Sequence, residues 1–203
     1  MGWNPYISPM RKQSCFTLLE LLTTVTVGAL LLSIAVPSFR TTIANNRQSN
    51  QLNTVLSGLI YARSEAIKRN ASVVICASTD KATCSGTSAW GTGWIIYYVP
   101  AGGNPATAPA AAAIIRTYPA LGGNNTLNTN AASPAPIAAV SSGTIVFQSS
   151  GMTTLANDAQ FSLCDARGKS YSRILMVGST GRAEVMPTTP APTWSGNALT
   201  PAC

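Results

Sequence analysis

Residues that could carry out acid–base chemistry are few in this 203-residue chain. It contains no histidine, and no two of its six carboxylates lie at a spacing typical of a catalytic pair. General acid–base catalysis near neutral pH usually relies on one or the other, and the sequence also lacks a glycine-rich phosphate loop and a cluster of metal ligands. We therefore expect a protein that is not an enzyme and needs no cofactor or metal. The carboxylates are Glu20, Glu65, Asp80, Asp158, Asp165 and Glu184.

The cysteines are the other reactive side chains, and they favour disulfide bonds in an oxidising compartment. Only 9% of the residues are charged, and small polar residues dominate the second half, as in loop-rich β structure outside the cytoplasm. Cys76 would end a strand and Cys84 follows a seven-residue loop, so these two can meet. Cys164 and the terminal Cys203 would then pair and tie down a proline-rich tail. Free buried thiols are the alternative.

The first predicted element is a long apolar segment that contains one carboxylate, Glu20. Residues 16–39 carry no other charge, and as a helix they would span about 36 Å, enough to cross a bilayer. Arg11 and Lys12 precede them and would hold that end in the cytoplasm. An intramembrane carboxylate costs roughly 2.5–3.5 kcal/mol, so we expect it to meet a positive charge from another subunit. Alternatively, it lies at the membrane edge and reaches water.

The sequence after Pro37 is polar but keeps apolar residues at spacings of three and four, which predicts an amphipathic continuation of the helix over 40–70. Asn70 suits the C-terminus of this helix. The apolar stripe consists of Leu52, Val55, Leu56, Leu59, Ile60, Ala66 and Ile67.

Residues 71–203 alternate short apolar runs with turn signals, which predicts a β-rich head. The stripe can cover one face of its sheet. The predicted fold class is therefore α+β, with a long N-terminal helical spine packed against an antiparallel sheet. We expect one strand in the middle of the low-complexity segment Ala101–Ser142. The expected strands are Ser72–Cys76, Trp94–Val99, Ile114–Tyr118, Thr144–Gln148, Phe161–Cys164, Arg173–Val177 and Arg182–Met186.

Residues 11–20 read RKQSC-FTLLE and resemble the prepilin cleavage site of type IV pilins and type II secretion pseudopilins. The resemblance implies that prepilin peptidase cuts between Cys15 and Phe16 and that Phe16 is then N-methylated. It also implies that Glu20 pairs with the N-terminal amine of a neighbouring subunit. Pro37 matches the proline that kinks pilin helices. The chain departs from the family at Cys15, where the family has glycine.

This resemblance divides the chain into a leader (1–15), a transmembrane and polymerisation helix (16–39), an amphipathic helix half (40–70) and a periplasmic head (71–203). The leader would remove the unpaired cysteine, and Met10 is an alternative start. The implied location is the bacterial inner membrane, with other pilins or pseudopilins and the inner-membrane assembly platform as partners.

Two other N-terminal signals resemble parts of this segment. An ordinary secretory signal could be cut after Ser33-Ile34-Ala35, because the small residues Ser33 and Ala35 suit that peptidase. A lipoprotein site at Cys15 is excluded, because polar residues and not an apolar run precede it.

The head resembles the GspH/FimT branch of these proteins. The similar segments are VICAS (74–78), WGTGWI (90–95), LCDARG (163–168) and STGR (179–182), together with the final Cys203. The resemblance implies a minor pilin that primes or caps a type IV pilus used for twitching, adhesion or DNA uptake. A pseudopilin of type II secretion is the alternative.

Relatives in this branch that take part in DNA uptake carry Gly-Arg-any-Arg near the C-terminus. In residues 181–184 of this chain, Glu184 replaces the second arginine and would repel phosphate. Weak DNA binding by a basic patch is one hypothesis, and a solvated strand edge is the other. The candidate DNA contacts are Arg167, Lys169, Arg173 and Arg182.

Overall fold

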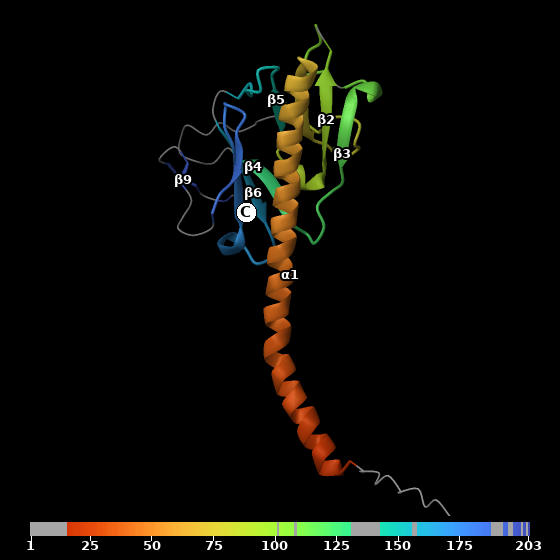
Figure 1. Ribbon diagram of the computed structural model, residues 1–203, viewed down its shortest axis with the longest axis vertical. Coiled ribbons are helices and arrows are strands. Elements are labelled where there is room, and N and C mark those ends of the chain that lie inside the picture. The colour runs from red at the N-terminus through yellow and green to blue at the C-terminus, as the bar shows by residue number, and fades with distance from the viewer. Residues whose placement is uncertain are drawn as a thin grey trace, which may run out of the picture. The chain divides into compact units, whose positions relative to one another are not determined.

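The computed structural model describes residues 16–100, 102–107, 109–130, 143–155, 158–187, 193–194, 197–199, 201 and 203. The predicted leader, with the cleavage-site residue Cys15, lies outside the described residues. The chain divides into two compact units, Met1–Asn45 and Asn46–Cys203. One helix, α1 (Leu18–Arg69), contributes to both (Figure 1).

In the second unit, α1 buries one stripe against the sheets and ends where the sequence predicted. Asn70 adopts a positive φ of 49°, and the N–H of Ala71 donates to the carbonyl of Ala66, which closes the helix C-terminus. The predicted stripe was wrong at two positions, since Ile60 is 55% exposed and Ile67 52% exposed. Each helical residue is rotated by about 100° from the one before it. Because Leu59 and Ala66 point into the core, Ile60 and Ile67, which follow them, point away from it. The buried apolar stripe is Leu52, Val55, Leu59, Ala62 and Ala66.

Two four-stranded antiparallel sheets share the helix as a common cover. Sheet A has the order β3-β2-β1-β5 and sheet B the order β4-β6-β7-β8. Sheet A comprises β1 (Ser72–Ala77), β2 (Trp94–Val99), β3 (Ile114–Tyr118) and β5 (Thr144–Phe147). Sheet B comprises β4 (Thr126–Asn130), β6 (Ala159–Cys164), β7 (Arg173–Val177) and β8 (Ala183–Val185). Short 3₁₀ turns are η1 (Trp90–Thr92), η2 (Ala111–Ala113) and η3 (Lys169–Tyr171), and β9 (Thr193–Trp194) pairs with β10 (Asn197–Ala198).

All seven predicted strands are present, three with the predicted bounds and four with ends that differ by one or two residues, and the α+β fold class is confirmed. The prediction of a single strand in the segment Ala101–Ser142 was wrong, because β4 also lies there. Its sequence, TLNTN, is polar, and Leu127 is its one fully buried apolar residue. Strand β4 forms because it pairs along its whole length with β6. The ribbon of β9 and β10 was also missed.

The main core lies between α1 and the inner faces of both sheets. Trp94 of β2 stacks on Tyr118 of β3, with ring centroids 4.9 Å apart. A Cβ at Gly58 would lie 3.4 Å from the indole nitrogen of Trp94, so this glycine lets the helix approach the stacked pair. Two smaller clusters of buried residues lie outside the main core. One is on the outer face of sheet A and the other is on the outer face of sheet B.

Candidate assembly surfaces

The first unit presents apolar side chains on all sides of α1. Phe16 is 76% exposed, Leu18 82% and Ile34 74%. Among the described residues, α1 is the helix long and apolar enough to cross a membrane, by length and composition. So much exposed apolar surface is unfavourable in water. This segment therefore needs an apolar environment, which lipid or other helices can supply.

Four hydroxyl groups in this segment do not oppose such an environment, because they donate to carbonyls of the same helix; they belong to Thr23, Thr24, Thr26 and Ser33. The Thr23 hydroxyl donates to the carbonyl of Glu20 (3.0 Å), and the Ser33 hydroxyl donates to that of Leu30 (2.7 Å). The helix continues through Pro37, whose ring removes one backbone hydrogen bond. Thr41 places its hydroxyl on the Pro37 carbonyl, 3.1 Å away.

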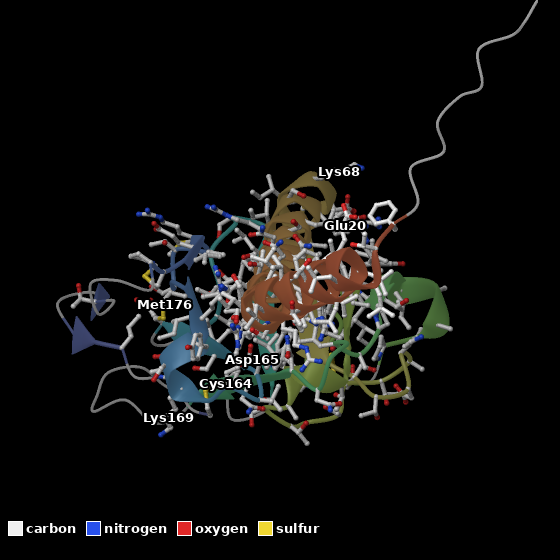
Figure 2. All side chains as sticks on the ribbon, turned by 90° about the horizontal axis from the view of Figure 1, so that it is seen from below. Glu20, Lys68, Cys164, Asp165, Lys169 and Met176 are labelled. Carbon is white, nitrogen blue, oxygen red and sulfur yellow. A yellow bond between two sulfur atoms is a disulfide. The ribbon has the colours of Figure 1, made fainter. Side chains whose placement is uncertain are left out.

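Glu20 lies in the first turn of α1, at a capped helix N-terminus (Figure 2). The backbone N–H of Glu20 donates to the hydroxyl oxygen of Thr17, 3.2 Å away. Thr17 is thus the N-cap residue, and Thr17-x-x-Glu20 has the pattern of a capping box. Sequence reasoning missed this role, although the spacing signals it. Within the described residues Glu20 forms no ion pair, and its carboxylate is exposed beside the positive end of the helix.

Both disulfides expected from the sequence are present in the head. Cys76 of β1 is bonded to Cys84, and Cys164 at the end of β6 is bonded to Cys203. The first bond closes a loop that Asp80 also organises. The carboxylate of Asp80 accepts hydrogen bonds from the hydroxyl and N–H of Thr83 and from the N–H of Ala82. These bonds hold the pKa of Asp80 well below its usual range.

Arg167, a candidate DNA contact, is held by an acidic neighbour. Its Nη2 atom lies 2.6 Å from Oδ2 of Asp165, and its guanidinium lies over the ring of Tyr171, 4.4 Å from the centroid. Burial opposes ionisation of Asp165, but the hydrogen bonds and the charge of Arg167 outweigh it and lower the pKa of the carboxyl. The charge of Arg167 is therefore largely compensated.

The four candidate cations do not form one patch. Lys169 in η3 lies at the end of sheet B that contains Asp165 and Cys164 (Figure 2). Arg173, at the start of β7, pairs with Leu163 of β6 at the same end. Arg182 lies beyond the other end of β7, where its carbonyl accepts a hydrogen bond from the N–H of Gly178. Five residues of extended strand separate the two sites by about 17 Å.

Arg182 is also ion-paired. Its guanidinium contacts the carboxylate of Glu184, the residue that replaces the second arginine of the DNA-uptake motif. Glu184 thus neutralises the first arginine in addition to replacing the second.

Sequence reasoning missed Arg63, which joins the two sheets to the helix. Its Nε donates to the carbonyl of Gly151 (2.9 Å), in the turn after β5, and its Nη2 donates to that of Thr180 (3.4 Å), between β7 and β8. Gly181 in the second turn has a φ of 77°, and a Cβ there would overlap the carbonyl oxygen of Gly151. No local signal identifies these contacts, because the partners are far apart in sequence.

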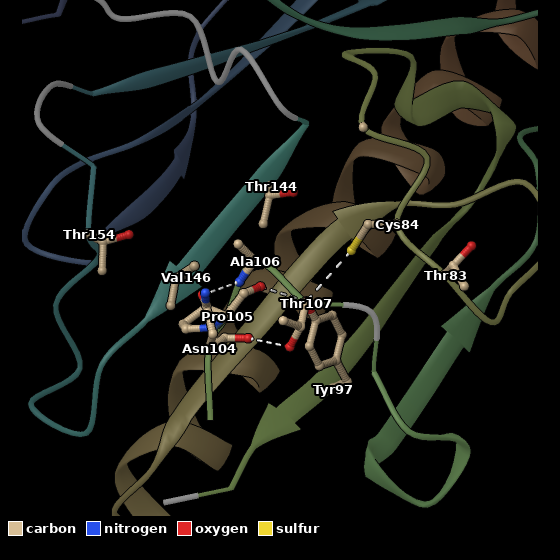
Figure 3. A pocket seen from close by; sticks show the side chains of 11 residues that line it. Thr83, Cys84, Tyr97, Asn104, Pro105, Ala106, Thr107, Thr144, Val146 and Thr154 are labelled. Carbon is tan, nitrogen blue, oxygen red and sulfur yellow. Dashed lines mark hydrogen bonds between the residues drawn. The ribbon is translucent and has the colours of Figure 1, made fainter. Parts of the chain in front are cut away.

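A cavity of about 610 Å³ lies over the outer face of sheet A (Figure 3). Tyr97 lines it and donates a hydrogen bond to the carbonyl of Pro105, 3.0 Å away. Burial raises the pKa of Tyr97, so its phenol stays neutral. None of the described residues that line the cavity is charged. Their hydroxyl and amide groups can form hydrogen bonds, but they include no base that could activate a nucleophile.

A family model described as type II transport protein GspH matches residues 51–181. This chain belongs to that family. Family membership makes it a pilin-like or pseudopilin-like structural protein, as the resemblance of its sequence implied. A comparison with curated protein sequences found no match.

Solved structures of minor pilins share the fold of this GspH-family chain. Two crystal forms of the type IV minor pilin FimU from Pseudomonas aeruginosa match with TM-scores of 0.55 and 0.51 and identities of 22% and 23%. These matches cover 73% and 70% of this chain and 94% of FimU in both cases. The minor pseudopilin EpsH from the type 2 secretion system of Vibrio cholerae matches with a TM-score of 0.46 and 12% identity, over 70% of this chain and 98% of EpsH. That similarity is too low to support an argument.

Proposed function

We propose that this GspH-family chain is a minor pilin that primes or caps assembly of a type IV pilus. Prepilin peptidase removes residues 1–15, residues 16–39 anchor the product in the inner membrane, and the head lies in the periplasm until the subunit joins other pilins. One observation carries the proposal: an exposed apolar helix with a single carboxylate, Glu20, continues into a disulfide-bonded head of the GspH family. An isolated secreted head would not need that helix.

Intact mass of the protein recovered from cell membranes tests this processing. The expected product begins at Phe16 and carries one added methyl group. A product that begins at Val36 would replace the proposal with an ordinary secreted protein. Cys15→Gly, which restores the residue that the family has at this position, serves as the matched variant and should give the same product in at least equal yield.

A pseudopilin of type II secretion is the second candidate, because the matching family is described by type II transport. Deletion of the gene separates the two candidates. Loss of surface fibres and twitching with normal protein secretion supports the pilus, and the opposite result supports the secretion system. A DNA-binding competence pilin is the third candidate, and the ion pairs of Arg167 and Arg182 weigh against it.

A further inference from the structure

Arg116 of β3 lies over the rings of two tyrosines. Its guanidinium carbon is 5.4 Å from the ring centroid of Tyr61, on α1, and 5.3 Å from that of Tyr118, on β3. Strand β3 is an edge strand of sheet A, beside β2 (Figure 1). The faces of aromatic rings attract a guanidinium, and this stacking does not use its N–H donors. The two rings therefore position the cation and leave its donors for another acceptor.

The charge of Arg116 is not compensated by a carboxylate. The residue is exposed, and within the described part of the chain it forms no ion pair. Burial raises the pKa of Tyr118, so this phenol stays neutral beside the guanidinium. Arg167 and Arg182 of sheet B, by contrast, each have an acidic partner. Arg116 is thus a positioned cation whose charge is available to a partner molecule.

Apolar side chains are exposed on α1 next to Tyr61. Ile60, which precedes Tyr61, is 55% exposed, and Ile67, about two turns further along the helix, is 52% exposed. Exposed apolar residues beside an arginine and a tyrosine are typical of protein interfaces, where both residue types are enriched.

A nucleic acid is a less suitable partner, because its backbone is bound by several cations together. The two cations in the last turn of α1, Lys68 and Arg69, already pair with Glu65. The site therefore fits a protein better than a nucleic acid.

A second copy of this chain is a poor source of the carboxylate. The chain has six carboxylate side chains, and Glu20 lies in the apolar segment of the first unit. The others already have partners in their own chain: Glu65 has Arg69, Asp80 has Thr83, Asp158 has the N–H of Ser179, Asp165 has Arg167, and Glu184 has Arg182. A second head could supply a carboxylate only by breaking one of these contacts.

We propose that Arg116, positioned by Tyr61 and Tyr118, binds a carboxylate on a different protein subunit, and that apolar residues around this carboxylate cover Ile60. A guanidinium can donate two parallel hydrogen bonds to one carboxylate, which fixes the orientation of the partner. The inference rests on the proposed function only in that the chain joins other subunits, and it applies equally to a pilus and to a secretion system.

Zero-length cross-linking of the full chain, in cell membranes and in sheared fibres, tests the contact. A carbodiimide joins a lysine amine to a carboxylate that touches it: an amide bond forms, and the reagent takes up the lost oxygen and becomes a urea. Arginine does not form this bond because it stays protonated. We expect Arg116→Lys, which keeps the cation, to cross-link to an Asp or Glu of another protein, identified by mass spectrometry. The yield should be about tenfold above that of Lys81, an exposed lysine in the Cys76–Cys84 loop.

Arg182→Lys is the matched control for the reaction. Its amine replaces a guanidinium that contacts Glu184, so it should cross-link within the chain. This product shows that the reagent reaches exposed pairs of the head.

Charge reversal tests whether the contact holds the two subunits together. Arg116→Glu should lower the amount of the identified partner that is captured with the chain about tenfold. Changing the cross-linked carboxylate of the partner to lysine should restore capture, because the charges are then opposite again. Lys81→Glu, a reversal at an exposed lysine outside the site, should leave capture unchanged. Immunoblots of the captured complex measure these amounts.

Three outcomes would overturn the inference. If position 116 cross-links only within this chain or not at all, while the Arg182→Lys control reacts, Arg116 is a solvated cation of an edge strand. A loss of capture that the partner's reversal does not restore would assign Arg116 to the stability of the head. A loss of DNA affinity of the full chain in Arg116→Ala, without a cross-link to a carboxylate, would assign the site to phosphate. Failure of the proposed function would appear separately, as a product that begins at Val36.

Discussion

Glu20 carries the only charge of residues 16–39, and its backbone and its carboxylate have separable roles. The backbone N–H is capped by Thr17, whereas the carboxylate is exposed. In an apolar surrounding that carboxylate needs a cationic partner. Glu20→Gln keeps the shape and the hydrogen-bonding groups but removes the charge. We expect this variant and Glu20→Ala each to lower incorporation into the fibre about tenfold, while the membrane pool of folded subunit stays normal.

The ratio of fibre-bound to membrane-bound subunit, measured on sheared fibres by immunoblot, checks this expectation. Normal incorporation of the glutamine variant with a defect in the alanine variant would assign Glu20 to helix capping. Normal incorporation of both would show that the carboxylate only reaches water at the membrane edge.

A second residue-scale prediction concerns Gly181, the glycine of the motif shared with DNA-uptake relatives. Its positive φ and its contact with the Gly151 carbonyl leave no space for a Cβ. Gly181→Ala should therefore lower the free energy of unfolding by about 2 kcal/mol or more, measured by urea denaturation of the head. Gly122→Ala is the matched control, because a Cβ there meets nothing within 4 Å. Equal stability of the two variants would contradict the packing role of Gly181.

At the scale of elements, the C-terminal turn of α1 depends on an ionised Glu65. This residue is 6% exposed, and its carboxylate accepts a 2.7 Å hydrogen bond from Nε of Arg69, with Lys68 3.6 Å away. The hydrogen bond from Arg69 outweighs burial and lowers the pKa of Glu65 below its ordinary value of 4.5. Because the folded state favours the carboxylate, its contribution to stability is complete above pH 4.5 and disappears as pH falls through the lowered pKa.

Glu65→Gln should thus destabilise the head by about 1 kcal/mol at pH 7 and by less near pH 3. Urea unfolding of the variant and of the wild-type protein at both pH values measures this difference in stability. Asp165 also has a lowered pKa, and its pH-dependent contribution cancels because both proteins contain it. Glu184→Gln breaks a more exposed pair, so its effect at pH 7 should be smaller. A Glu65→Gln effect that does not change with pH would contradict the ion pair.

Features set by local sequence could be predicted, and those set by distant partners could not. The end of α1 at Arg69, the strand β2 and the two cysteine pairs follow from spacing, turn residues and chain connectivity. Strand β4 and the Arg63 contacts depend on partners far along the chain. The separation of Arg182 from Arg173 could have been predicted. A tight turn between the predicted strands Arg173–Val177 and Arg182–Met186 places Arg182 beside Val177, at the end of the first strand that is far from Arg173.

At the scale of the whole molecule, the net charge is +7, but the four candidate DNA contacts do not form a single anion-binding surface. At the two ends of sheet B, Arg167 and Arg182 are paired with Asp165 and Glu184. Among the described residues, Lys169 and Arg173 form no such ion pair. Cations that are already compensated release few counterions from DNA, so little affinity is gained from them.

We therefore expect the head to bind double-stranded DNA weakly, without sequence preference and only at low salt. Four phosphate contacts would give a log–log salt slope of about −3.6, whereas Lys169 and Arg173 alone give about −1.8. Glu184→Arg removes the partner of Arg182 and adds a cation, so it should strengthen binding and steepen the slope by about 1.8. Arg182→Ala should leave the DNA affinity of the wild-type head almost unchanged. Combined with Glu184→Arg, it should abolish most of the gain in affinity.

Gel shifts over a salt series measure these effects. Lys81→Ala, in the Cys76–Cys84 loop, is the control for the loss of one exposed cation. If Glu184→Arg binds no more tightly than the wild-type head, this end of sheet B is a solvated strand edge, and the chain is a purely structural subunit.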